Sequence, residues 1–191
     1  IEDAGSLPVG ETFNPNNLVT KAVENNEQIK TTERISGEKL EAINPPNLDQ
    51  FNLEARNQFL IRYTVTPVKQ GEEIVGVLLS GDVVKQPIVD ATNDSFDSGY
   101  SGVYLVKPNG EFQLEVSQER TEQATNTNVI IPDTSLLERA LNNPDGIVTD
   151  WVSLDGKGYA SSAQVVRNYV GDPVWVLVRG TSATQLNALL Q

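Results

Sequence analysis

Apolar and polar residues alternate along the chain from about residue 58 onward. Between residues 58 and 68 every second position is apolar, the period that a strand with one buried face requires; these positions are Phe59, Ile61, Tyr63 and Val65. A turn at residues 69–71 leads to a second apolar run at residues 74–79. The two runs predict a β-hairpin.

More strands with turns between them are predicted further along. They cover residues 100–106, 111–117, 147–154, 159–166 and 174–179. Short turn signals, Pro108-Asn109-Gly110 and Asp155-Gly156, separate neighbouring strands, and such short connections favour antiparallel pairing. The polar residues 118–130 predict a loop.

Segments with helical spacing lie before and among these strands. We expect three helices with N-caps at Asn16 or Asn17, at Ser36 and at Asp133. Two more helices are expected to begin at Pro87 and near residue 181. Residues 28–35 predict a short strand. This order indicates an α+β fold with a central antiparallel sheet flanked by helices. We expect residues 1–57 to pack on a core formed by residues 58–191.

Composition narrows the chemistry. The 191 residues include no Cys, His or Met, which excludes disulfides, a thiolate nucleophile, a Cys/His zinc site and a Ser-His-Asp triad. Lys and Arg number 14 against 26 Asp and Glu, a net charge of −12 that argues against binding nucleic-acid phosphates. No stretch approaches the roughly 20 apolar residues that span a bilayer. No cofactor or metal is predicted.

An ordered set of sequence tracts carries a family resemblance. The tracts cover residues 74–82, 85–90, 99–105, 110–112, 131–137, 150–152 and 176–182. Over roughly residues 18–190 the chain resembles the Cache sensor domains of bacterial chemoreceptors and related membrane signalling proteins. The resemblance implies a PAS-like core, with a central antiparallel sheet of about five strands flanked by helices.

The resemblance also implies a location and a role. Cache domains lie outside the cytoplasmic membrane, so we expect an extracytoplasmic (periplasmic) domain of an inner-membrane protein that signals as a homodimer, as in a methyl-accepting chemotaxis protein. The family binds small metabolites, and we expect no enzymatic activity of this chain. Residues 1–16 show no helical pattern, so we expect the family's N-terminal stalk helix to be cut away. The last helix stops in mid-pattern at Gln191, and we expect it to lead towards a missing transmembrane segment.

Two cations are candidate anchors for an anionic ligand. Arg62 lies on the face opposite Ile61 and Tyr63, where its guanidinium would hold a carboxylate if that face lines a cavity. The alternative is a solvated strand arginine, or one paired with a nearby Glu. Lys85 precedes a predicted helix N-terminus, a favourable place for an anion, or is a surface lysine.

Side chains with a polar tip complete the candidate ligand site. They are Tyr100, Tyr104, Trp151, Tyr159 and Ser117. A small-molecule pocket combines apolar walls with a few such polar anchors, although ordinary core packing also explains each aromatic residue. Tyr104 is the strongest candidate because it lies in the middle of its strand. Aspartates cluster at positions 82, 90, 94 and 97, where helix caps and solvated loops are the alternative to a cation or acid–base site.

Three functions remain after this reasoning. The first is a sensor that binds a small organic solute, such as a carboxylate or an amino acid. The second is a ligand-free structural or protein-interaction domain of such a receptor. The third is a carboxylate-based hydrolase, which the aspartates permit but no pair of carboxylates supports. The sequence contains neither the amino-acid-binding motif of double Cache receptors nor the paired Arg/His pattern of citrate sensors, so the ligand class stays open.

Overall fold

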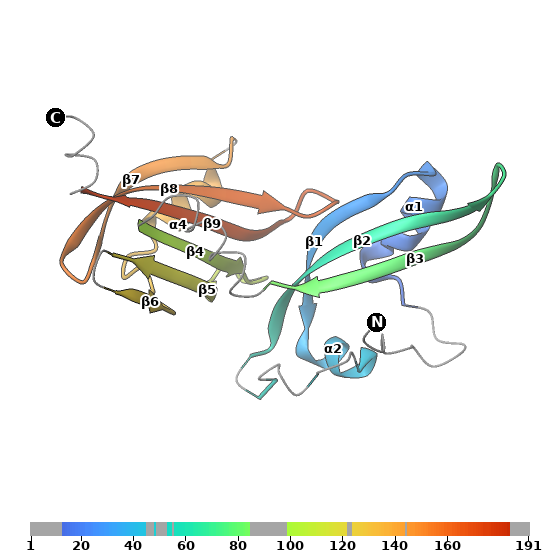
Figure 1. The fold of residues 1–191 in the computed structure, drawn as a ribbon, viewed down its shortest axis with the longest axis horizontal. Helices are drawn as coiled ribbons and strands as arrows, with labels where there is room; N and C mark the ends of the chain where they lie inside the picture. The colour runs from blue at the N-terminus through green and yellow to red at the C-terminus, as the bar shows by residue number, and fades with distance from the viewer. Residues whose placement is uncertain are drawn as a thin grey trace. The chain divides into compact units, whose positions relative to one another are not determined.

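The chain divides into two compact units, residues 1–83 and residues 84–191, here called unit 1 and unit 2. The computed structural model describes residues 13–44, 48, 53–54, 56–84, 99–121, 124–143 and 145–183. Each unit has its own antiparallel sheet (Figure 1). The division falls after Val83, whereas the boundary expected after residue 57 precedes the second strand of unit 1.

Unit 1 is built on a three-stranded sheet. Strands β1 (Ile29–Ser36), β2 (Gln58–Gln70) and β3 (Glu73–Val83) pair antiparallel in chain order. The predicted hairpin is therefore confirmed as β2 and β3, which are longer than the apolar runs indicated. The turn between them uses Gly71 with a positive φ of 65°, which glycine adopts without steric cost.

Two helices pack on this sheet, with a short 3-10 turn (Pro15–Asn17) ahead of the first. Helix α1 (Leu18–Asn25) buries Leu18 and Ala22, and α2 (Gly37–Ile43) buries Leu40 in the same core. The Ser36 cap is confirmed, since its hydroxyl accepts from the Lys39 amide at 3.3 Å. Asn17 is the N-cap residue of α1, one of the two expected, but its side chain makes no capping hydrogen bond. Asn14 takes that role from further back, accepting from the Val19 amide at 2.9 Å.

Unit 2 is built on a six-stranded sheet. Its strands are β4 (Gly99–Val106), β5 (Phe112–Arg120), β6 (Thr125–Thr127), β7 (Ile147–Leu154), β8 (Lys157–Arg167) and β9 (Pro173–Ser182). The order across the sheet is β6-β5-β4-β9-β8-β7, so the first and last strands of the unit lie side by side at its centre. All eight residues of β4 are buried.

Helix α4 (Ser135–Asn142) packs on one face of this sheet. Its Leu136, Leu137 and Ala140 are buried with apolar side chains of β4, β7, β8 and β9, forming the core of unit 2. We call this the helix-covered face. The helix begins one residue later than expected, with Thr134 as its N-cap, while the Asp133 carboxylate accepts from the Ser135 amide at 2.9 Å.

The α+β class with antiparallel sheets is confirmed, and the expected single sheet of about five strands is wrong. Strands β2 and β3 do not join the main sheet but form a second one with β1. The loop predicted at residues 118–130 is wrong in part, because β5 continues to Arg120 and β6 follows. The helix expected from Pro87 and most of the helix expected from about residue 181 lie outside the described residues.

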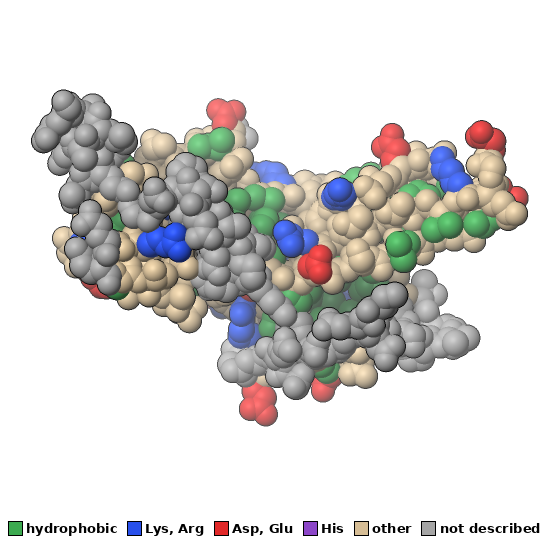
Figure 2. All heavy atoms as spheres, in the orientation of Figure 1, with side chains coloured by type: hydrophobic (Ala, Val, Ile, Leu, Met, Phe, Trp, Pro, Cys, Tyr) green, Lys and Arg blue, Asp and Glu red, His purple; other side chains and the backbone are tan. Residues whose placement is uncertain are grey.

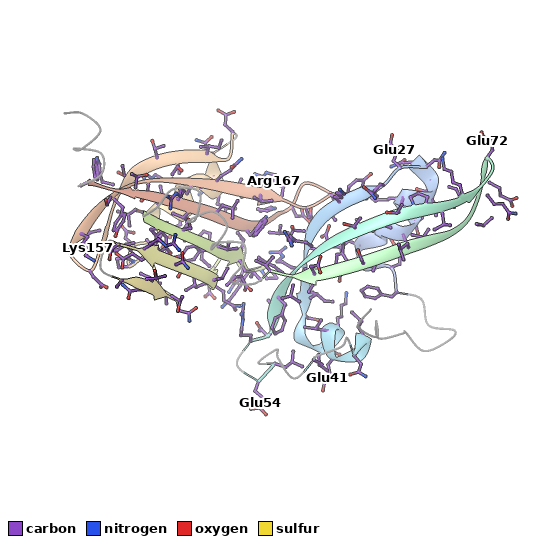
Figure 3. The ribbon with its side chains drawn as sticks, in the orientation of Figure 1. Glu27, Glu41, Glu54, Glu72, Lys157 and Arg167 are labelled. Carbon is purple, nitrogen blue, oxygen red and sulfur yellow. The ribbon has the colours of Figure 1, made fainter. Side chains whose placement is uncertain are left out.

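Charged and apolar side chains both appear on the surface. The labelled carboxylates Glu27, Glu41 and Glu72 are exposed (Figure 3). Apolar side chains are exposed along the β2–β3 hairpin as well (Figure 2), where Leu78 is 65% accessible. Among the residues that the structure describes, no helix is long and apolar enough to cross a membrane.

Candidate functional site

Four of the predicted site residues meet on the helix-covered face of unit 2. Tyr100, Tyr104 and Tyr159 belong to the core on this face, and Ser117 is brought there by β5, where it pairs with Gly102 of β4. All four side chains are buried, with at most 3% of any residue accessible. Residues up to 59 positions apart in the sequence are thus brought together by strand pairing.

Two other predicted residues do not join this group, and the third falls outside the described part of the chain. Arg62 lies in unit 1, where it is exposed and pairs in register with Asp82 on the outer face of the sheet. Trp151 is 62% exposed, because it faces away from the buried Val152 and Leu154 on edge strand β7. Lys85 lies outside the described residues.

Tyr100 and Tyr104 form a directed chain of hydrogen bonds. The Ile131 amide donates to the Tyr104 hydroxyl at 2.9 Å, and the two tyrosine hydroxyls are 2.6 Å apart. The Tyr100 hydroxyl donates to the Val129 carbonyl at 3.0 Å. Since a hydroxyl has one proton, Tyr104 must donate to Tyr100. This series of hydrogen bonds runs from the Ile131 amide through the Tyr104 and Tyr100 hydroxyls to the Val129 carbonyl.

Ser117 contributes a second donor to the same carbonyl. Its hydroxyl donates to the Val129 oxygen at 2.8 Å. We call Tyr100, Tyr104 and Ser117 the hydroxyl cluster. It holds the connection between β6 and α4 against the sheet. Burial is the main reason why the pKa values of Tyr100 and Tyr104 are raised above the ordinary tyrosine value. Both hydroxyls therefore stay protonated at neutral pH.

A missing side chain makes room for the cluster. Gly102 lies between the two tyrosines on β4, and a Cβ there would be 2.5 Å from the Tyr100 hydroxyl oxygen and 3.0 Å from ring carbons of both tyrosines. The rings therefore occupy the space over Gly102 that any larger residue would need. The sequence Tyr-Ser-Gly-Val-Tyr at 100–104 encodes this packing locally.

A buried carboxylate, which the sequence analysis missed, lies beside the cluster. Glu119 is 1% accessible and follows Ser117 on the same face of β5. Its oxygens accept from the Tyr159 hydroxyl at 2.5 Å and from the Asn126 amide at 2.9 Å. The ammonium of Lys157 (labelled in Figure 3) is 3.8 Å away. Continued alternation past Ser117 was the signal that could have revealed it.

The partners of Glu119 decide its charge. Burial by itself would raise the pKa of this carboxyl, but the hydrogen bonds from Tyr159 and Asn126 and the charge of Lys157 hold it below its ordinary value. Glu119 is therefore ionised at neutral pH. Burial, together with the hydrogen bond to this carboxylate, raises the pKa of Tyr159. Tyr159 thus acts as a neutral donor to a buried anion.

A cavity of about 300 Å³ lies within unit 1. Its apolar wall comes from Phe13, Ile35, Ile43 and Tyr63, with Phe13 and Tyr63 ring centroids 6.2 Å apart. Its lining also includes the cations Arg34 on β1 and Lys39 on α2, together with residues 14–16 and Ala42. None of these residues was predicted as a site, because they come from three separate segments of the chain.

Glu33 is a second buried carboxylate, close to this cavity. It is 1% accessible, and it accepts from the Asn16 amide at 2.6 Å and from the Thr31 hydroxyl at 3.1 Å. Burial, followed by the charge of Glu33, raises the pKa of Tyr63. The carboxylate stands at a core-facing position of β1, between Thr31 and Ile35. An acidic residue at a core-facing position of a predicted strand could have indicated this buried carboxylate from the sequence.

The aspartate cluster gains no support from the described part of the chain. Asp82 is exposed on β3, and residues 90, 94 and 97 lie outside the described residues. Among the described residues, no three Asp or Glu side chains are close enough together to hold a metal ion.

Comparisons of the chain with protein-family models, with curated proteins and with solved structures found no match.

Proposed function

We propose that this chain is the extracytoplasmic ligand-sensing domain of a membrane-bound bacterial receptor, acting in chemotaxis or related signal transduction. Its role is to bind a small organic solute rather than to catalyse a reaction. The sequence tracts that resemble Cache domains support this proposal. The fold supports it in a coarser way, since unit 2 is an antiparallel sheet with a helix packed on one face.

One observation carries the proposal: two buried hydroxyls donate to a single carbonyl of a connecting segment. Tyr100 and Ser117 both donate to Val129, which lies outside any strand or helix. A carboxylate or carbonyl oxygen of a solute can accept the same two hydrogen bonds. The exchange leaves no donor unsatisfied, so it avoids the cost of a buried unpaired hydroxyl.

The same exchange supplies a means of signalling. A solute that takes the two hydroxyls releases Val129 and weakens the hold on residues 129–131, which lead into α4. Binding would then favour one of two arrangements of this segment, to the extent of the solute's differential affinity for them. In the intact homodimeric receptor this bias would reach the membrane through the C-terminal end of the chain.

A thermal-shift screen tests the proposal. Carboxylates, amino acids, amines and sugars are added in turn, because a ligand that binds the folded state raises the melting temperature by mass action. We expect at least one class to raise it, with Ser117→Ala losing most of the shift. Ser153→Ala, on the exposed side of β7, is the matched control. No shift from any class, or equal shifts in both variants, contradicts the proposal.

A ligand-free structural or interaction domain is the second candidate. It is favoured by the finding that the hydroxyls of Tyr100, Tyr104 and Ser117 all have partners within the protein. Such a network needs no solute to be complete. If the screen gives no shift while Ser117→Ala lowers the intrinsic melting temperature, this second function is the better account.

A further inference from the structure

The cavity of unit 1 combines an apolar wall with positive charge. Phe13 and Tyr63 present aromatic surface, and Ile35 and Ile43 extend it. Arg34 and Lys39 join the same lining from different elements, β1 and α2. The volume of about 300 Å³ lies at the lower end of the range for small-molecule sites. The cavity is therefore suited to a small ligand.

The sign of the charge stands out against the rest of the chain. The protein carries 26 acidic residues against 14 basic ones, yet among the described lining residues there are two cations and no Asp or Glu. The exposed acids of α2, Glu38 and Glu41, are not part of that lining. A ligand entering this space meets a local positive charge on an acidic protein.

The nearest buried acid does not reverse this charge preference. Glu33 is already engaged by Asn16 and Thr31 on its two carboxylate oxygens. A cationic ligand would be repelled by Arg34 and Lys39. An anion is attracted instead, because guanidinium and ammonium groups hold carboxylates by charge-assisted hydrogen bonds.

We propose that the cavity of unit 1 binds a small organic anion, with its carboxylate at Arg34 and Lys39 and its apolar body against the wall that includes Phe13 and Tyr63. This site is separate from the hydroxyl cluster of unit 2 and does not depend on the function proposed for it. Lys39 is exposed, and its flexible stem lets the ammonium follow the ligand. The aromatic wall selects anions that carry a ring or a branched chain over acetate-sized ones.

Three probes that share one body and differ in charge test the proposal. Phenylacetate, neutral phenylacetamide and cationic phenethylammonium are titrated into the full chain by calorimetry at low salt. We expect phenylacetate to bind about tenfold or more tightly than phenylacetamide, the effect of one charge-assisted hydrogen bond. We expect no binding of phenethylammonium. Added salt should weaken the binding of phenylacetate because the cations lie near the surface.

Variants then locate the site. Lys39→Gln and Arg34→Gln should each weaken phenylacetate binding severalfold to tenfold. Lys69→Gln makes the same charge change on the exposed part of β2, outside the described lining, and should leave binding unchanged. In labelled protein, the side-chain amide NMR signals of Asn14 and Asn16 should move with phenylacetate, while that of Asn168 in unit 2 stays in place.

Several results would overturn the proposal. Equal binding of phenylacetate and phenylacetamide removes the role of charge. Equal weakening by Lys69→Gln and Lys39→Gln removes the role of this cavity, as does an NMR shift confined to unit 2. Absence of phenylacetate binding at about 1 mM shows that the cavity does not take this class of ligand. If a variant fails to fold, the charge comparison among the three probes still decides with the unaltered chain.

Discussion

Each unit holds one buried carboxylate by two hydrogen bonds, but the surroundings of the two carboxylates differ. In unit 2, Glu119 is held by Tyr159 and Asn126 beside a cluster whose hydroxyls also bond to one another and to Val129. In unit 1, Glu33 is held by Asn16 and Thr31, while Asn16 also lines an open cavity. Similar residues thus form a filled polar interior in one unit and part of the lining of a cavity in the other.

In unit 2 a solute would have to displace Val129 from the hydroxyls, whereas the cavity of unit 1 already has room for new atoms. Any substitution within a filled network removes a hydrogen bond or causes a steric clash. The choice of residues there is therefore limited by the stability of the protein as well as by any ligand. Residues around a cavity can change with little loss of stability and still alter binding. Substitutions matched between the units therefore test the contrast directly.

The largest effect is expected from Tyr159→Phe. The variant removes a hydrogen bond to a buried, ionised carboxylate, and such bonds contribute about 1.5–3 kcal/mol to the free energy of unfolding. Urea unfolding at neutral pH measures the loss. Tyr169→Phe, which removes the hydroxyl of a tyrosine that is 39% exposed, is the control and should change the free energy little. If the two variants lose the same amount, Glu119 does not depend on Tyr159.

Gly102→Ala is expected to cost slightly less, about 1–3 kcal/mol, because the new methyl group would meet the Tyr100 hydroxyl in an already filled space. Its counterpart in unit 1 is Ala42→Leu, which adds three carbons next to the cavity and should stay within about 0.5 kcal/mol of the unaltered protein. Urea unfolding of both variants gives the comparison. An equal cost in both would mean that unit 1 is as tightly filled as unit 2.

The smallest effect is a dependence on pH, because burial and hydrogen bonding oppose each other in setting the pKa of Glu119. The native pKa is lower than the unfolded one, so the stability from ionised Glu119 is present above the ordinary pKa of 4.5 and is lost as pH falls through the lower native value. The unfolding free energies of the unaltered protein and Glu119→Gln should therefore converge as the solution is acidified below pH 4.5. A constant difference throughout that range would show that the charge of Glu119 contributes nothing.

Much of the secondary structure was readable from local pattern. The alternation at residues 58–68 and the Asp155-Gly156 turn predicted elements that the structure contains, since both depend on neighbours in the sequence. The division into two sheets was not readable in the same way. No local feature of the sequence indicates that β2 and β3 pair with β1 rather than with β4.

The candidate site was predicted in part for the same reason. Tyr100, Tyr104 and Ser117 were named as polar tips, and strand register brought them together. Glu119 was missed because β5 was expected to end at Ser117, two residues too early for its alternation to be seen. The cavity of unit 1 is formed by residues 13–16, β1, α2 and Tyr63, a grouping that only the tertiary packing reveals.

The central pairing of β4 with β9 has a consequence for how the protein is made. Each strand pair of unit 1 joins neighbours in the sequence, so this sheet has all its strands once β3 has left the ribosome. In unit 2, Tyr100 of β4 pairs with Gly180 of β9. Until β9 emerges, the sheet is therefore in two pieces, β6-β5-β4 and β8-β7. Such distant pairing is slow to form. During translation, the edge of β4 that β9 will cover is unpaired, and unpaired strand edges favour aggregation with other chains.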